Sequence, residues 1–175
     1  MIAAIVQGPI GRIMPVAVVL LALQTTFFVD VQPFGVVLQV LTAFAAAAGV
    51  AGGPERGMLA GFLVGLLFDL GTAAPLASSS LTMGLAGLVA GSVALLNVEV
   101  RWWLAAGFVA LGAAAGELAV PAVRYVIGQE TVFSERLFTI VPVVAVGAAV
   151  LSPLLVPLGR WCLRIGSVPW KVPHE

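Results

Sequence analysis

The sequence predicts an all-α integral membrane protein, a bundle of six transmembrane helices forming a single domain over residues 1–175. Hydrophobic residues make up 61% of the chain and charged residues only 9%, whereas an ordinary soluble domain has about 25% charged residues. The few charges separate uncharged runs that are long enough to cross a hydrocarbon layer of about 30 Å. Water is therefore not the expected solvent for most of the surface.

The uncharged runs define the expected helices. They place the spans at about 13–29, 34–53, 57–72, 78–96, 103–126 and 135–158, with 159–175 as a juxtamembrane tail. The first span lies between Arg12 and Asp30, and Pro15 fits its first turn, where a missing N–H costs nothing. The second span follows a turn at Pro33.

The third and fourth spans are expected to form a hairpin. From Gly57 to Asn97 the chain has 41 residues with one charge, Asp69, and as a continuous helix they would extend about 62 Å, enough for two crossings. The chain is expected to turn around Pro75, and Pro54 to Arg56 to make a tight connection before the hairpin.

Small residues recur at four-residue spacing on four of these helices. They are Gly49 and Gly53, Gly57, Gly61 and Gly65 ahead of Asp69, Gly87 and Gly91, and Gly112 and Gly116 ahead of Glu117. Residues at this spacing lie on one side of a helix and let helix backbones approach each other in lipid. Each stripe therefore predicts a partner helix.

The fifth and sixth spans carry interfacial and helix-bending residues. Trp102 and Trp103 follow charged residues, as expected for an anchor at headgroup level. Pro121 removes a backbone hydrogen bond and predicts a kink, and three prolines predict an irregular sixth helix. The loop at 128–136 is the longest water-exposed segment, which leaves no room for a soluble domain.

The distribution of basic residues predicts the orientation. An even number of spans puts both termini on one side, which would hold Arg12, Arg56, Arg101, Arg160, Arg164 and Lys171, against Arg124 and Arg136 on the other. The positive-inside rule then makes both termini cytoplasmic.

Two carboxyl groups are expected at depth. A charge at the centre of a membrane helix costs about 2.5–3.5 kcal/mol, so such residues usually face protein or water. Asp69 is either a buried functional acid or a helix-end residue that reaches headgroup water. Glu117 is either paired with Arg124, two turns away, or buried and hydrogen-bonded; a proton or ion relay is a further alternative for both acids.

Other chemistry is not expected. Ser78 to Ser80 have no histidine to act as a base, and the lone Cys162 and His174 cannot build a metal cluster, so neither an enzyme, a metal site nor a cofactor is predicted. The formal net charge of zero gives no reason to expect nucleic acid as a partner.

The hairpin resembles a known family. The run from Gly61 to Leu70, GFLVGLLFDL, followed by Pro75-Leu76 and a glycine-bearing helix to Gly91, is similar to the rod shape-determining protein MreD family. Family members usually continue Pro-Leu-Gly, where this chain has Ala77, and often open their second helix with Pro-Asp-Leu, where this chain has Pro33-Phe34-Gly35.

This resemblance implies a non-enzymatic scaffold of the bacterial cell-elongation (rod) complex, which controls cell shape and lateral peptidoglycan synthesis from the cytoplasmic membrane. The implied partners are a single-span MreC-like protein, MreB, peptidoglycan synthases and the lipid bilayer. Gly61→Leu or Gly65→Leu is then expected to block association with the MreC-like partner by separating helix backbones.

Two other functions remain open. The family resembles in fold the membrane substrate-binding subunits of energy-coupling-factor vitamin transporters, which need a polar pocket and an Ala-xxx-Ala face on the first helix; Ala17 and Ala22 do not have that spacing. A proton-coupled transporter would depend on Asp69 and Glu117, and it predicts that Asp69→Asn abolishes pH-dependent flux.

Overall fold

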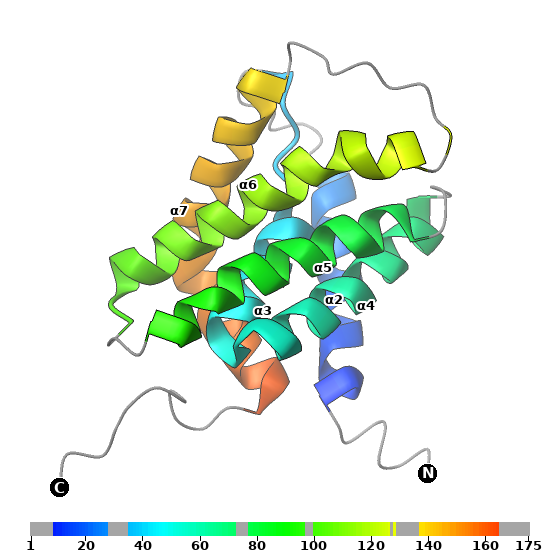
Figure 1. Cartoon of the computed structure of the whole chain (residues 1–175). Coiled ribbons are helices and arrows are strands. Elements are labelled where there is room, and N and C mark those ends of the chain that lie inside the picture. Colours follow the sequence, from blue (N-terminus) through cyan, green and yellow to red (C-terminus); the bar gives the residue numbers. More distant parts are fainter. Residues whose placement is uncertain are drawn as a thin grey trace, which may run out of the picture.

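A computed structural model of the chain describes residues 9–27, 35–72, 77–96, 100–126, 128 and 137–164. These residues form the α-helices α2 (Pro9–Thr26), α3 (Val40–Gly52), α4 (Pro54–Thr72), α5 (Ser78–Gly91), α6 (Trp102–Val126) and α7 (Leu137–Leu163), with a 3-10 helix, η2 (Ser92–Leu96) (Figure 1). Because the described residues contain no strand, the predicted helical class is confirmed for this part of the chain.

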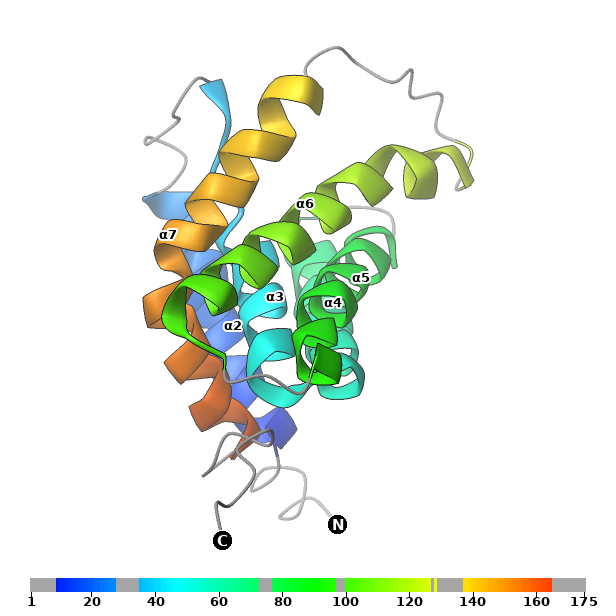
Figure 2. The same cartoon turned by 60° about the vertical axis from the view of Figure 1, so that its left-hand side comes forward.

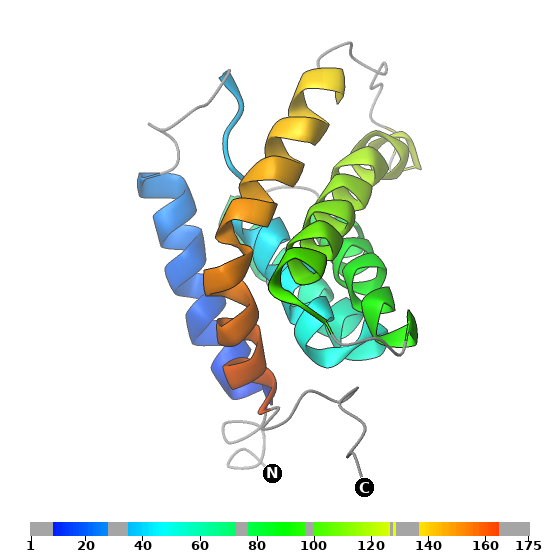
Figure 3. The same ribbon diagram turned by 90° about the vertical axis from the view of Figure 1, so that its left-hand side faces the viewer.

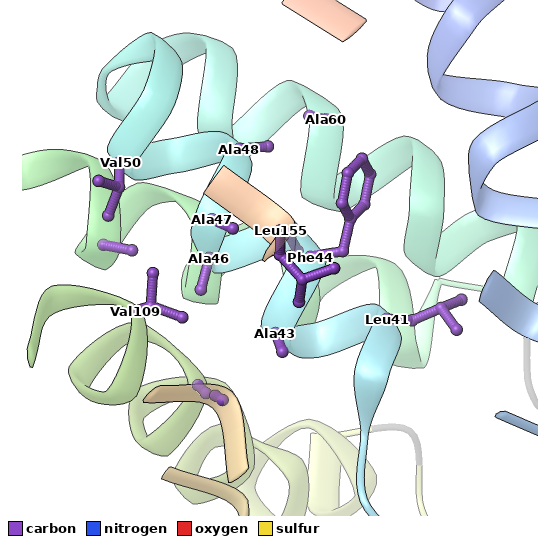
Figure 4. Close-up of a cluster of buried hydrophobic side chains, with 14 of the residues drawn as sticks. Leu41, Ala43, Phe44, Ala46, Ala47, Ala48, Val50, Ala60, Val109 and Leu155 are labelled. Carbon is purple, nitrogen blue, oxygen red and sulfur yellow. The ribbon is translucent and has the colours of Figure 1, made fainter. Parts of the chain in front are cut away.

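Helix α3 lies at the centre of the bundle. Every residue from Val40 to Ala51 is buried, and α3 contacts all five other α-helices. Its side chains are mostly methyl groups, so surrounding helices can approach its axis closely. Figure 3 shows α3 between a side formed by α2 and α7 and a side formed by α5 and α6. In Figure 4, Phe44 of α3 lies near Ala60 of α4 and Leu155 of α7.

Around this centre, helices α4, α5 and α6 form a layer. Helices α4 and α5 share the most extensive contact in the molecule, and α5 packs next most extensively against α6. Figure 2 shows α4 and α5 paired along their lengths, with α6 beside α5. Helix α2 makes the smallest contacts of the six α-helices.

The second expected span is not one continuous helix. Helix α3 begins at Val40 rather than residue 34. Gly35 has a φ of +73°, which is incompatible with a right-handed helix, and residues 36–39 after it are not helical. The side chain of Gln24 accepts a hydrogen bond from the Leu41 N–H (3.1 Å), which has no partner within α3. The 13 residues of α3 extend about 20 Å, less than the hydrocarbon thickness.

The start of the hairpin also differs from the expectation. Pro54 to Arg56 form the first turn of α4 instead of a separate connection, since proline is favourable at the first helical position. Gly53 alone turns the chain, with a φ of +86°. At the other end of the hairpin, α5 ends at Gly91 and the chain continues as η2 rather than as α-helix.

The first and last helices are longer than expected at the terminal end. Helix α2 begins at Pro9 instead of residue 13, and the last residues of the first expected span, 28 and 29, lie outside the described residues. Helix α7 continues to Leu163, so the expected tail from 159 starts as helix. Gly159 lies within α7 and faces α3, where an added Cβ atom would lie 3.1 Å from the Ala48 Cα atom. Pro121 and the prolines of α7 lie within continuous helices.

The exterior of the bundle is apolar on all sides. Each of the five outer helices exposes large apolar side chains, for example Val19, Leu59, Leu81, Leu118 and Val150. Three stretches, Ser78–Leu96, Trp102–Val126 and Leu137–Leu163, are long and apolar enough to cross a membrane. A core buried inside an equally apolar exterior is unfavourable in water, so these properties indicate a membrane protein.

Candidate functional site

Three glycines bring three helices into backbone contact. We call Gly49 of α3, Gly57 of α4 and Gly87 of α5 the three-glycine junction. A Cβ atom on Gly57 would overlap the Gly49 Cα atom and the Gly87 carbonyl oxygen, and a Cβ atom on Gly87 would overlap the Gly57 carbonyl oxygen. Only glycine is therefore compatible with this packing.

The rest of the α4 stripe also faces α5. A Cβ atom on Gly61 would overlap the carbonyl oxygen of Met83, and one on Gly65 would lie 2.5 Å from the Ser79 carbonyl oxygen and from the Ser80 Cα atom. The partner helix for this stripe is therefore α5 of the same chain.

The remaining predicted glycines lie where α5 meets the start of α4 and where it meets α6. A Cβ atom on Gly91 would lie 2.6 Å from the Pro54 Cα atom. On α6, Cβ atoms on Gly112 and Gly116 would lie 2.5 Å and 3.0 Å from the carbonyl oxygens of Ala86 and Thr82. Because all these faces are covered within the chain, a partner protein would have to contact outward-facing side chains. Pro75 lies outside the described residues.

Asp69 closes the hairpin at its other end. Its side chain is only 1% exposed and does not reach the surface of the chain. The backbone N–H groups of Ser79 and Ser80 donate hydrogen bonds to the carboxylate (3.1–3.4 Å), and the hydroxyl groups of Ser78 and Ser80 lie within 3.4 Å and 3.3 Å of its oxygens. Asp69 on α4 therefore acts as the N-terminal cap of α5.

The residue preceding α5 explains why the cap comes from another helix. Ala77 makes no side-chain cap hydrogen bond and has a φ of +73° and a ψ of −3°, in the left-handed region. Without Asp69, the first N–H groups of α5 would be buried without acceptors.

Glu117 is also buried, but in the described part of the chain it lacks hydrogen bonds of the kind that Asp69 accepts. Its side chain is 5% exposed, and within the described residues no hydrogen bond or ion pair to it is found; Arg124 acts on it only as a more distant charge. A Cβ atom on the neighbouring residue, Gly116, would lie 3.0 Å from the Thr82 carbonyl oxygen of α5 and 3.4 Å from a methyl carbon of Thr42 of α3.

No protein-family model, curated protein or solved structure matches this chain. Within the described residues, no three His, Cys, Asp or Glu side chains gather where they could hold a metal ion.

The sequence did not single out two further features. The sequence predicts a helix start at Ser78, but not that the Ser79 and Ser80 N–H groups at this start donate to Asp69 of another helix. The second feature joins the start of α2 to the end of α7: the guanidinium carbon of Arg12 lies 4.9 Å from the centroid of the Trp161 ring, and Arg12 Nη1 donates to the Trp161 carbonyl oxygen (3.2 Å). These residues are 149 positions apart, so no local pattern could have revealed the contact.

Proposed function

We propose that this chain is a non-enzymatic membrane scaffold of the bacterial cell-elongation (rod) complex, of the MreD type. The observation that supports this most is the agreement between the resembling segment and the geometry of the hairpin. Gly61 and Gly65 lie where α4 and α5 touch, and Asp69 caps α5. Position 77, a glycine in the family pattern, has the positive φ that favours glycine.

The proposed scaffold is a six-span bundle in the cytoplasmic membrane. The apolar exterior of all five outer helices supports this placement, although α3 is too short to cross alone and α4 carries Glu55, Arg56 and Asp69. In this arrangement α3 is enclosed by helices that face lipid.

Both termini of the chain are proposed to face the cytoplasm. The start of α2 and the end of α7 lie together, as the contact between Arg12 and Trp161 requires. The described arginines of this end are Arg12, Arg56, Arg101, Arg160 and Arg164, whereas Arg124 lies at the opposite end. The positive-inside rule favours the cytoplasm for the arginine-rich end.

The proposed role is binding. Because the glycine stripes are covered within the chain, a single-span MreC-like partner would pack on outward-facing side chains, such as those of Leu59 and Phe62 on α4. MreB and peptidoglycan synthases would be linked to the chain through the same complex.

Replacement of the native protein tests this proposal. We expect the tagged chain, expressed in a rod-shaped bacterium depleted of its own MreD, to restore rod shape and to co-purify with the MreC-like protein in mild detergent. A tagged, unrelated six-span protein at equal membrane abundance is the control and should leave the cells rounded. If the chain reaches the membrane but neither restores shape nor retains MreC, the proposal fails.

The same purification addresses the rival function. A vitamin-binding subunit of an energy-coupling-factor transporter would retain a small molecule and a coupling protein with its ATPases. Ala17 is fully buried whereas Ala22 is exposed, so these two alanines do not form a shared face for a coupling partner. Recovery of ATPases and a bound vitamin instead of MreC would favour the transporter.

A further inference from the structure

The end of the molecule at which α2 begins and α7 ends holds a fixed guanidinium group. Arg12 lies over the ring of Trp161 and donates one hydrogen bond to its carbonyl oxygen, and the Cys162 thiol lies 3.9 Å from the Arg12 carbonyl oxygen. A guanidinium group has five N–H donors, so most of those on Arg12 remain available while its position is set by the two helices.

Three more guanidinium groups belong to the same end. Arg160 precedes Trp161 by one position on α7, and Arg164 follows Trp161 by three positions, directly after the last residue of α7. Arg56 on α4 lies close to this turn, because the Arg56 Cβ atom and the Leu163 Cδ1 atom both lie near Gly52 (3.1 Å and 2.6 Å from its ideal Cβ position).

These positive charges are not neutralised by the described part of the chain. No carboxylate there forms an ion pair with any of the four arginines, and the acid nearest in sequence, Glu55, is exposed on the first turn of α4. Uncompensated guanidinium groups favour a ligand with phosphate oxygens, which they bind through paired N–H groups.

The surroundings of the cluster favour a lipid over a free anion. Trp161 is 55% exposed and Leu154, two turns earlier on α7, is 71% exposed, so an apolar surface continues from the arginines along the bundle. A phospholipid can place its phosphate on the arginines and its acyl chains against this surface, whereas inorganic phosphate uses only the first part.

We propose that Arg12, Arg56, Arg160 and Arg164 form a binding site for the headgroup of an anionic phospholipid. This inference rests on the membrane placement proposed above but not on the role in cell elongation. The site would hold the start of α2 and the end of α7 at a defined depth in an anionic leaflet.

The test uses the full chain reconstituted in vesicles of phosphatidylcholine, with or without phosphatidylglycerol, and measures thermal unfolding and the lipids retained after mild extraction. We expect phosphatidylglycerol to raise the unfolding midpoint by several degrees and to be retained selectively. Arg160→Gln and Arg164→Gln should each reduce this retention several-fold. Neither side chain makes a hydrogen bond or ring contact in the described structure, so these variants should fold normally.

Arg124→Gln, at the opposite end, is the matched control and should retain phosphatidylglycerol as the unchanged chain does. Equal retention of both lipids by the unchanged chain, or an equal loss in Arg124→Gln, would overturn the proposal. Inorganic phosphate added to phosphatidylcholine vesicles should have no effect, and equal stabilisation by it would show an anion site instead. Because no outcome depends on cell shape, failure here is distinguishable from failure of the scaffold function.

Discussion

The carboxyl group of Asp69 stabilises the hairpin from inside it. From the sequence, its four-residue spacing from Gly65 placed it on the glycine face of α4, which is where it lies. Its role as a cap could not be predicted, because the donors are the backbone N–H groups of Ser79 and Ser80, and their position depends on the path of the turn. The alternative that Asp69 reaches headgroup water does not hold in this structure, since the side chain is buried.

Removal of this cap should destabilise the bundle. We expect Asp69→Ala to lower the free energy of unfolding by about 1–3 kcal/mol, because the buried Ser80 N–H group and the partly buried Ser79 N–H group lose their acceptor. Asp69→Asn keeps one acceptor oxygen and should cost less. Thermal unfolding in detergent measures the order, and an Asp69→Ala variant as stable as the unchanged chain would contradict the capping role.

Replacement of Ala77 by glycine should make the protein more stable. Its φ of +73° costs an L-residue about 1–2 kcal/mol, whereas glycine adopts it freely. The greater freedom of glycine in the unfolded chain offsets part of this gain. We therefore expect Ala77→Gly to raise stability by roughly 0.5–1 kcal/mol, measured by the unfolding midpoint. Ala77→Val, which is disfavoured at positive φ, should lower it, and the reverse order would contradict the prediction.

At the scale of the helices, the sequence predicted which faces need a partner but not which helix supplies it. The stripe of Gly57, Gly61 and Gly65 implies close backbone approach, and its partner is the next helix of the chain. The start of α3 was missed because residues 34–39 are as uncharged as the helix that follows. Helix formation there is prevented by backbone geometry at Gly35, which hydropathy does not report.

Two glycines allow a matched test of the α4–α5 contact. Gly61→Leu should separate the helices and destabilise the chain by about 3 kcal/mol or more, since the added side chain meets backbone. Gly107→Leu, where no atom lies within 4 Å of the added Cβ, should be tolerated.

Both variants can be compared by yield and by gel filtration in detergent. Loss of partner binding in Gly61→Leu would follow from this damage to the chain itself, so it does not locate a partner surface. Equal behaviour of the two variants would contradict the packing described here.

At the scale of the molecule, composition predicted the helical class but not the central helix. Helix α3 occupies the centre because its small side chains let five helices surround it. The glycines and acids of the candidate site could be identified from spacing. The joining of Arg12 to Trp161 could not, because it depends on how the first and last helices meet.

The proposed orientation can be checked with two reporters. One that is active only in the cytoplasm should work when fused after Glu175, and one that is active only outside it should work when inserted at Gly128, which is exposed and follows α6. The arginine-rich end fixes this orientation through the positive-inside rule. Exchanged activities of the two reporters would reverse the topology.

The burial of α3 has a consequence for how the protein is made. A helix of about 20 Å is too short to cross the hydrocarbon layer by itself. While it emerges from the ribosome, the helices that later enclose it on four sides do not yet exist. We therefore expect α3 to remain beside the insertion machinery until α4 and α5 are synthesised, and to enter the bilayer with them as one unit. The helix at the centre of the finished bundle would then leave the translocation channel later than its place in the sequence implies.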